Sequence, residues 1–243
     1  MLNRLLHLNE SPSRTVAQLP NQNWPFQNVA QVSRHYAHKF PDKVALYFDN
    51  EADQTHSALD SAADQLAVSL QALGLVKGDV VSFQLPNWHE AAVINLACVR
   101  LGLVVNPIVT IYRDREVEYM LSNSQSKAIF VAAKVGSFNY LEMLARLRSK
   151  LPSLKHVFAL RCTVDTPDCD NLYETLIANG RGKKPNEPKY DVNDVKMLLY
   201  TSGTTGNPKG VVHTHQSLYW AMENSRQHWS IDEHDIMLMP SPI

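Results

Sequence analysis

The sequence predicts an α/β fold in which mainly parallel strands are covered by helices. Short apolar runs alternate with segments of helical periodicity along most of the chain. The segments between successive runs are long enough for the crossovers that parallel strands require. The runs are apolar throughout rather than alternating between apolar and polar residues, which is typical of a sheet with helices on both faces.

The strands are predicted from apolar runs that end at turn residues. The run VVSFQL, stopped by Pro86-Asn87, is typical of them. The predicted strands are 43–48, 80–85, 104–105, 128–133, 156–160, 196–200 and 235–239.

The helices are predicted from apolar residues at positions i, i+3 and i+4. The clearest pattern runs from Leu59 to Leu70, with Ser57 as the expected N-cap and Gly74 as the expected end. The predicted helices are 29–38, 58–73, 90–101, 116–121, 140–147, 172–178 and 216–228, the last with Thr214 as its N-cap.

Proline and glycine suggest four regions along the chain. Residues 1–27 contain prolines and no clear period, which is typical of an irregular lead-in. Residues 28–180 are expected to form a first α/β subdomain. The tract RGKKPNEPK opens a solvated linker at 181–193. Residues 194–243 are expected to begin a second α/β subdomain.

The composition excludes several classes of protein. The 243 residues carry 23 basic and 24 acidic side chains, a net charge of −1, so a basic surface for nucleic acid is not expected. Cys98, Cys162 and Cys169 lack CxxC spacing, so we expect no metal site. We also expect the protein to reside in a reducing compartment. The sequence shows neither a signal peptide nor a run long enough to span a bilayer. We therefore expect a soluble, cytoplasmic protein.

One loop has the residues of a phosphate-binding site. Glycine is scarce, at 9 residues, yet three glycines fall in the stretch YTSGTTGNPKG after an apolar run. Glycines let backbone N–H groups approach a phosphate, hydroxyls add neutral donors, and Lys209 adds a cation. The alternative is a flexible polar turn. The spacing matches neither GxxxxGK[ST] nor GxGxxG, which disfavours a P-loop kinase or a nicotinamide enzyme.

The stretch TSGTTGNPKG resembles the phosphate-binding loop of the AMP-forming, adenylate-forming synthetases, which include acyl-CoA synthetases, luciferases and peptide-synthetase adenylation domains. Three upstream segments also resemble this family: QTHSALDSAADQLAVSLQALGLVKGDVVSFQLPN, VRLGLVVNPI and REVEYMLSNSQSKAIFV. The resemblance runs from about residue 28 to the end. It implies part of the N-terminal domain of the adenylate-forming fold.

The resemblance implies a two-step ligase. ATP and a carboxylic acid would form an acyl-adenylate and pyrophosphate, and coenzyme A would then take the acyl group as a thioester. Mg²⁺ is expected to accompany the nucleotide. By resemblance Lys209 is catalytic, and the residues that hold the β- and γ-phosphates are Thr201, Ser202, Gly203, Thr204, Thr205, Gly206 and Lys209.

The family is longer than this chain, so we expect the chain to be an N-terminal fragment of an acid–CoA ligase, inactive alone. The stretches GVVHTHQSL and MPSPI resemble ligases for medium-chain or alicyclic acids. One alternative is a non-catalytic or split nucleotide-binding module that needs a second chain. Another is a fragment of a different adenylating enzyme. Association through an exposed sheet edge, formed by strand 235–239, is a further expectation.

Two groups of side chains outside the loop have simpler interpretations. His213 and His215 lack Cys or carboxylate companions, so packing or capping is expected rather than metal binding. Trp220, Met222 and Trp229 are expected to lie in the core rather than to line an acyl pocket.

Overall fold

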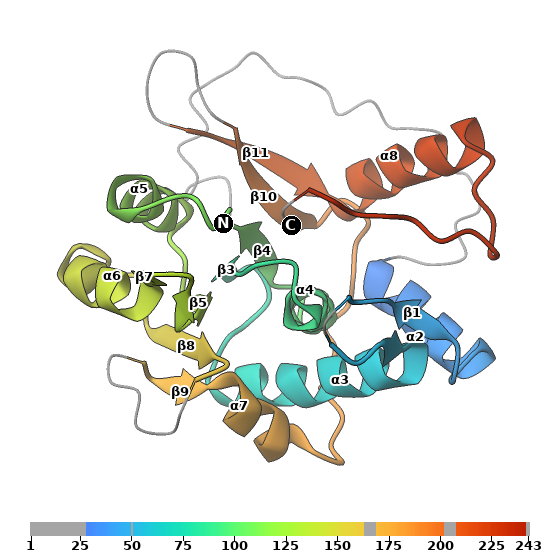
Figure 1. The fold of residues 1–243 in the computed structure, drawn as a ribbon, viewed down its shortest axis with the longest axis horizontal. Helices are drawn as coiled ribbons and strands as arrows, with labels where there is room; N and C mark the ends of the chain where they lie inside the picture. The colour runs from blue at the N-terminus through green and yellow to red at the C-terminus, as the bar shows by residue number, and fades with distance from the viewer. Residues whose placement is uncertain (1–27, 50, 163–168, 202–207, 242–243) are drawn as a thin grey trace.

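The computed structural model describes residues 28–49, 51–162, 169–201 and 208–241 (Figure 1). A seven-stranded sheet has the strand order β11-β10-β4-β3-β5-β8-β9, and all neighbouring strands are parallel except the β10–β11 pair. The strands are β3 (Val80–Gln84), β4 (Val104–Pro107), β5 (Ala128–Ala132), β8 (His156–Leu160), β9 (Asn171–Leu172), β10 (Val195–Thr201) and β11 (Lys209–Thr214). The mainly parallel sheet confirms the predicted fold class.

Two small antiparallel pairs lie outside this sheet. They are β1 (Val44–Leu46) with β2 (Gln54–Thr55), and β6 (Lys134–Val135) with β7 (Phe138–Asn139).

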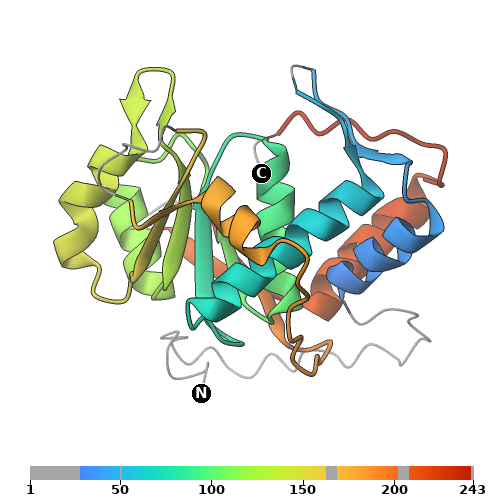
Figure 2. The ribbon, with the colours of Figure 1, turned by 90° about the horizontal axis from the view of Figure 1, so that it is seen from below.

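Helices cover both faces of the large sheet (Figure 2). One layer contains α3 (His56–Ala72), α4 (His89–Arg100) and α7 (Tyr173–Gly180), and the other contains α5 (Asp114–Ser124) and α6 (Tyr140–Leu147). Among the described residues, the remaining helices are α2 (Val29–Lys39), which packs against α3 and α4, the short 3₁₀ helix η1 (Arg148–Lys150), and α8 (His215–His228).

Alternation along the central strands explains the two apolar layers. In β5, Phe130 packs in the cluster with α3, α4 and α7, whereas Ile129 and Val131 pack in the cluster with α5 and α6. Successive side chains of a strand point to opposite faces, so one apolar run serves both clusters. No helix of the described residues has the length and apolar character needed to cross a membrane.

Several local predictions are confirmed and several are wrong. Both β8 and α6 have the predicted bounds, and Gly74, at φ +84°, follows the end of α3. The N-cap of α3 is Thr55 and not Ser57, because the Thr55 hydroxyl accepts a hydrogen bond from the backbone N–H of Ala58 at 3.2 Å.

The chain after the glycine-rich loop departs from prediction in three ways. The loop does not run directly into a helix, because residues 209–214 form β11 on the edge of β10. Residues 235–239 form no strand, since nothing pairs with them among the described residues; Leu238 is 84% exposed. Met222 and Trp229 lie at the surface and not in the core, because α8 buries only His215.

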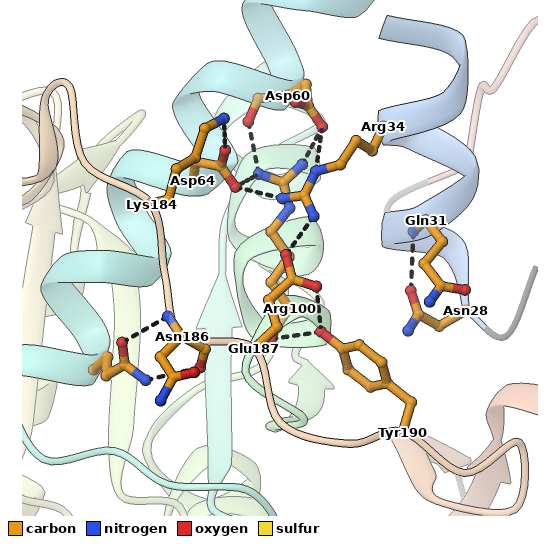
Figure 3. A network of polar contacts seen from close by, with 11 residues as sticks. Asn28, Gln31, Arg34, Asp60, Asp64, Arg100, Lys184, Asn186, Glu187 and Tyr190 are labelled. Atoms are coloured by element: carbon orange, nitrogen blue, oxygen red, sulfur yellow. Dashed lines mark hydrogen bonds and ion pairs between the residues drawn. The ribbon is translucent and has the colours of Figure 1, made fainter. Parts of the chain in front are cut away.

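The segment 181–193 is fastened to the helices by polar contacts (Figure 3). Gln71 of α3 donates to the Asn186 carbonyl oxygen at 3.0 Å and accepts from the Asn186 backbone N–H at 3.1 Å. The Tyr190 hydroxyl lies 2.6 Å from the Arg100 carbonyl oxygen. The stem of Lys184 is exposed, but its ammonium group pairs with Asp64 of α3. This segment therefore follows a fixed path into β10.

Next to that segment lies a buried network of ion pairs (Figure 3). The Arg100 side chain is completely buried and donates to the Asp60 carbonyl oxygen at 2.7 Å and to the carboxylates of Asp60 and Asp64. Asp64 also accepts from Arg34 of α2 at 2.7 Å. The network joins α2, α3, α4 and the segment before β10.

Since β10 pairs with β4, residues 195–214 join the large sheet. The division of the chain into two subdomains stays a prediction.

Candidate phosphate-binding site

The sheet brings the end of β10 to the edge where parallel strands end. Because β10, β4 and β3 run parallel, the chain leaves Thr201, Pro107 and Gln84 at the same carboxyl edge. The chain after β3 enters α4 in one helix layer, and the chain after β4 enters α5 in the other. In open α/β sheets, ligands bind outside the carboxyl ends of the strands where the connections change face in this way.

The described residues place both ends of the predicted phosphate loop. Thr201 and Lys209 face each other in the β10–β11 register, and the Thr201 hydroxyl donates to the Lys209 carbonyl oxygen at 3.4 Å. Both residues are exposed. The other predicted loop residues, Ser202, Gly203, Thr204, Thr205 and Gly206, lie outside the described residues.

The hairpin therefore sets Lys209 beside Thr201 across the two strand ends that flank the loop. Within the described part of the chain, the Lys209 ammonium group has no ion-pair partner. An exposed cation without a carboxylate partner is available to an anionic ligand. The arrangement fits a site that uses hydroxyls, backbone N–H groups and one positive charge to hold a phosphate chain.

The hairpin stem packs on α5 through Tyr200. The Tyr200 hydroxyl donates to Asn123 Oδ1 at 2.7 Å, and its ring meets the Tyr119 ring edge-to-face with centroids 6.4 Å apart. Burial is the main cause that raises the pKa of Tyr200. A Cβ built on Gly210 would lie 3.3 Å from the Tyr200 ring, so glycine there lets the ring lie close to β11. The sequence carried no signal for the α5 contact.

The two histidines near the loop lie in different surroundings. His215 is buried at the first turn of α8, whose N-cap is Thr214 as predicted. Burial, aided by Lys196, lowers the pKa of His215 to about 4. His213 lies opposite Met197 in the hairpin register.

A cluster of His and Glu side chains lies at the end of β8. Ligand atoms of Glu51, His89 and Glu90 fall within 4.8 Å of one another. Arg161, whose guanidinium lies 3.9 Å from the Trp88 ring centroid, donates to Glu90 at 2.7 Å and to Glu51 at 2.8 Å. A guanidinium already pairs with both carboxylates, so we interpret this cluster as an ion-pair network and assign it no metal.

The start of β10 contains a buried lysine. The Lys196 ammonium group donates to Asn95 Oδ1 of α4 at 2.8 Å, and burial lowers the pKa of Lys196 from 10.5 to about 8. The unfolded chain therefore holds more protons than the folded chain between these two values, and stability should rise with pH there.

Replacing Lys196 with methionine should remove this dependence on pH. Relative to the variant, the wild-type chain should gain on the order of 3 kcal/mol of unfolding free energy as the pH rises from about 8 to 10.5. Urea unfolding at a series of pH values measures the difference, with the exposed Lys155→Met as the matched control. A difference between wild type and Lys196→Met that is constant with pH would contradict this prediction.

The fold and the residues at this edge define an α/β protein with a candidate phosphate-binding hairpin. Comparison with known proteins goes further: the chain belongs to the family of AMP-binding enzymes, whose family model matches residues 33–243.

Three known proteins illustrate the relationship. The medium-chain fatty-acid–CoA ligase of Escherichia coli K12 is 29% identical over 220 residues, which are 90% of this chain and 38% of the ligase. The long-chain fatty-acid–CoA ligase FadD13 of Mycobacterium tuberculosis is 30% identical over 228 residues, 89% of this chain and 41% of that protein. The solved structure of acetoacetyl-CoA synthetase from Streptomyces lividans matches with a TM-score of 0.76 at 28% identity, covering 84% of this chain and 33% of that one.

These matches confirm both the predicted resemblance and part of the adenylate-forming fold. The chain spans about two fifths of the length of these two curated ligases, as the 38% and 41% coverage shows.

Proposed function

We propose that this chain provides the phosphate-binding part of an ATP-dependent carboxylic acid–CoA ligase. The observation that carries the proposal is the β10–β11 hairpin, which sets Lys209 beside Thr201 at the carboxyl edge of the sheet. Membership in the family of AMP-binding enzymes supports it. The names of the relatives support a fatty acid as the carboxylic acid, and an alicyclic acid is the other candidate from the sequence.

In this proposal the loop binds the part of ATP that leaves as pyrophosphate. The hydroxyls of Thr201, Ser202, Thr204 and Thr205 donate to β- and γ-phosphate oxygens. The backbone N–H groups of Gly203 and Gly206 do the same, and the Lys209 ammonium group neutralises charge. Holding this charge while the carboxylate attacks the α-phosphate lowers the barrier by positioning and electrostatics.

The other reactants are coenzyme A and Mg²⁺. Mg²⁺ supplies further charge neutralisation when it is bound to the phosphates. The stretch YTSGTTGNPKG contains no carboxylate, so the metal would come with the nucleotide. Coenzyme A would take the acyl group from the adenylate in the second step.

Two further expectations stay proposals. Cys98 and Cys162 are free thiols, which supports a cytoplasmic location. Association through a sheet edge would now involve β11, the outermost strand beside β10 among the described residues.

The test of the proposed function is a chimera in which residues 33–243 replace the matching segment of the Escherichia coli relative. We expect the folded chimera to form acyl-CoA from ATP, a medium-chain acid and coenzyme A. A matched chimera with scrambled residues 201–209 should fold and form none. A folded chimera that cannot adenylate any acid would contradict the proposal.

The chain alone should give no acyl-CoA. Adenylation needs groups that converge on the α-phosphate while the acid is held in line, and orientation alone accounts for about 7–11 kcal/mol of such barriers. This chain covers only 38% of the Escherichia coli ligase, which serves as the positive control. Coupled pyrophosphate release measures turnover. A rate within about tenfold of the control would show that the matched segment is sufficient for turnover, which would contradict this prediction.

A further inference from the structure

Tyr200 connects the hairpin stem to α5 just before the loop begins. Its hydroxyl donates to Asn123 Oδ1 at 2.7 Å, and the carbonyl oxygen of Met120 lies farther away, at 3.4 Å. Its ring packs against Tyr119 and lies next to Gly210 of β11. Tyr200 therefore contacts both strands of the hairpin and one helix of the body.

This contact lies closer to the loop than the described pairing of β10 with β4. β10 is in register with β4 at Met197↔Val105, and no pair closer to Thr201 joins these two strands among the described residues. β11 lies at the edge of the sheet and pairs with β10. Near the loop, Tyr200 thus adds a contact with α5 to the pairing of β10 with β4.

The helix on the other side of the contact is well anchored. Val117 and Met120 of α5 are completely buried. Asp114 pairs with Arg146 of α6 at 3.0 Å, and Glu118 pairs with Lys150 at 2.9 Å. The core therefore fixes the stretch of α5 that carries Asn123, whose side chain lies at the surface.

The surface of α5 beside the stem is hollowed. A cavity of about 560 Å³ is lined by Asp114, Arg115, Glu118, Tyr119, Ser122 and Asn123. The cavity shares Tyr119 and Asn123 with the Tyr200 contact. Without the Asn123 acceptor, the stem would have one fewer contact with α5.

We propose that Asn123 is a positioning residue for phosphate binding, because it holds Tyr200 and so fixes the direction in which the loop leaves the sheet. The inference rests on the proposed function of the loop. A hydrogen bond of this kind contributes little to overall stability. Its effect should appear in the affinity for phosphates, since a loop fixed before binding loses less entropy on binding.

The test compares Asn123→Leu, which removes the acceptor, with Asn123→Asp, which keeps one. Titration calorimetry on the whole chain should show that Asn123→Leu and Tyr200→Phe each weaken pyrophosphate binding by about fivefold to tenfold. The double variant should be no weaker than either single variant. Asn123→Asp should stay within about twofold of the wild type.

Tyr140→Phe is the matched control, because it removes another phenol contact, 2.9 Å from Tyr140 Oη to the Thr110 carbonyl oxygen, away from the hairpin. It should leave pyrophosphate affinity unchanged. Hydrogen exchange gives a readout that needs no nucleotide: amides of β11 should exchange about fivefold faster in Asn123→Leu than in wild type or Asn123→Asp.

The outcomes separate the two proposals. Loss of pyrophosphate binding in Lys209→Ala with wild-type binding in Asn123→Leu would overturn the positioning role and leave the proposed function standing. Equal β11 exchange in Asn123→Leu and wild type would also overturn it. Faster β11 exchange in Asn123→Leu, together with no pyrophosphate binding by the wild type, would show that Asn123 holds the stem but that the loop is not a phosphate site. That outcome would overturn both the positioning role and the proposed function.

Discussion

Replacing Arg100 with methionine is expected to lower the free energy of unfolding by about 3–5 kcal/mol, which is typical when one partner of a buried ion pair is removed. The Arg100 side chain is completely buried, and Asp64, which it neutralises, is only 2% exposed. Methionine fills most of the space but donates no hydrogen bond. Asp60 and Asp64 would then share fewer positive charges in a site from which water is largely excluded.

Urea unfolding of the whole chain measures this loss. Arg100→Lys should fall between wild type and Arg100→Met, because lysine keeps the charge but lacks the planar fork that reaches both carboxylates. The control is Arg146→Met, which breaks the exposed pair with Asp114 and should cost less than about 1 kcal/mol. If Arg100→Met costs no more than Arg146→Met, the buried network does not stabilise the fold as described.

The second large effect concerns Lys209. In the chimera, Lys209→Ala should slow adenylation by about 10²–10³-fold, the loss seen when one group that stabilises developing charge is removed. Thioester formation from supplied acyl-adenylate should change far less, because the phosphates that Lys209 is proposed to hold have left by then. Acid-dependent ATP–pyrophosphate exchange measures the first step, and coenzyme A acylation measures the second.

The control for this experiment is Lys155→Ala, an exposed lysine at the start of β8 and thus at the opposite edge of the sheet. It should leave both half-reactions unchanged. An equal loss in both half-reactions for Lys209→Ala would mean that Lys209 acts on folding or on the acyl group rather than on the departing phosphates.

The fold class could be predicted because its signals are local. An apolar run such as 128–132 identifies itself as a buried strand, and the periodicity of 140–147 identifies a helix. The errors occur where pairing with a neighbouring strand decides whether a stretch becomes a strand. The stretch KGVVHT is a strand because it returns along β10, whereas the apolar run 235–239 finds no partner among the described residues.

The candidate site was only partly visible in the sequence. The glycines, hydroxyls and Lys209 lie close together in the chain, so their pattern predicts a phosphate loop. The contact between Asn123 and Tyr200 joins residues 77 positions apart, and no periodicity links them. The burial of Arg100 likewise depends on carboxylates from a different helix. Contacts of this kind follow from packing and can be found only in the folded chain.

The central claim is that the β10–β11 hairpin binds the β- and γ-phosphates of a nucleotide. Titration calorimetry of the whole chain with Mg·ATP, pyrophosphate and AMP tests it most directly, with Lys209→Ala beside the wild type. We expect ATP and pyrophosphate to bind at least about tenfold more tightly than AMP, and Lys209→Ala to abolish this preference. Binding of AMP as tight as that of ATP, or wild-type pyrophosphate affinity in Lys209→Ala, would contradict the claim.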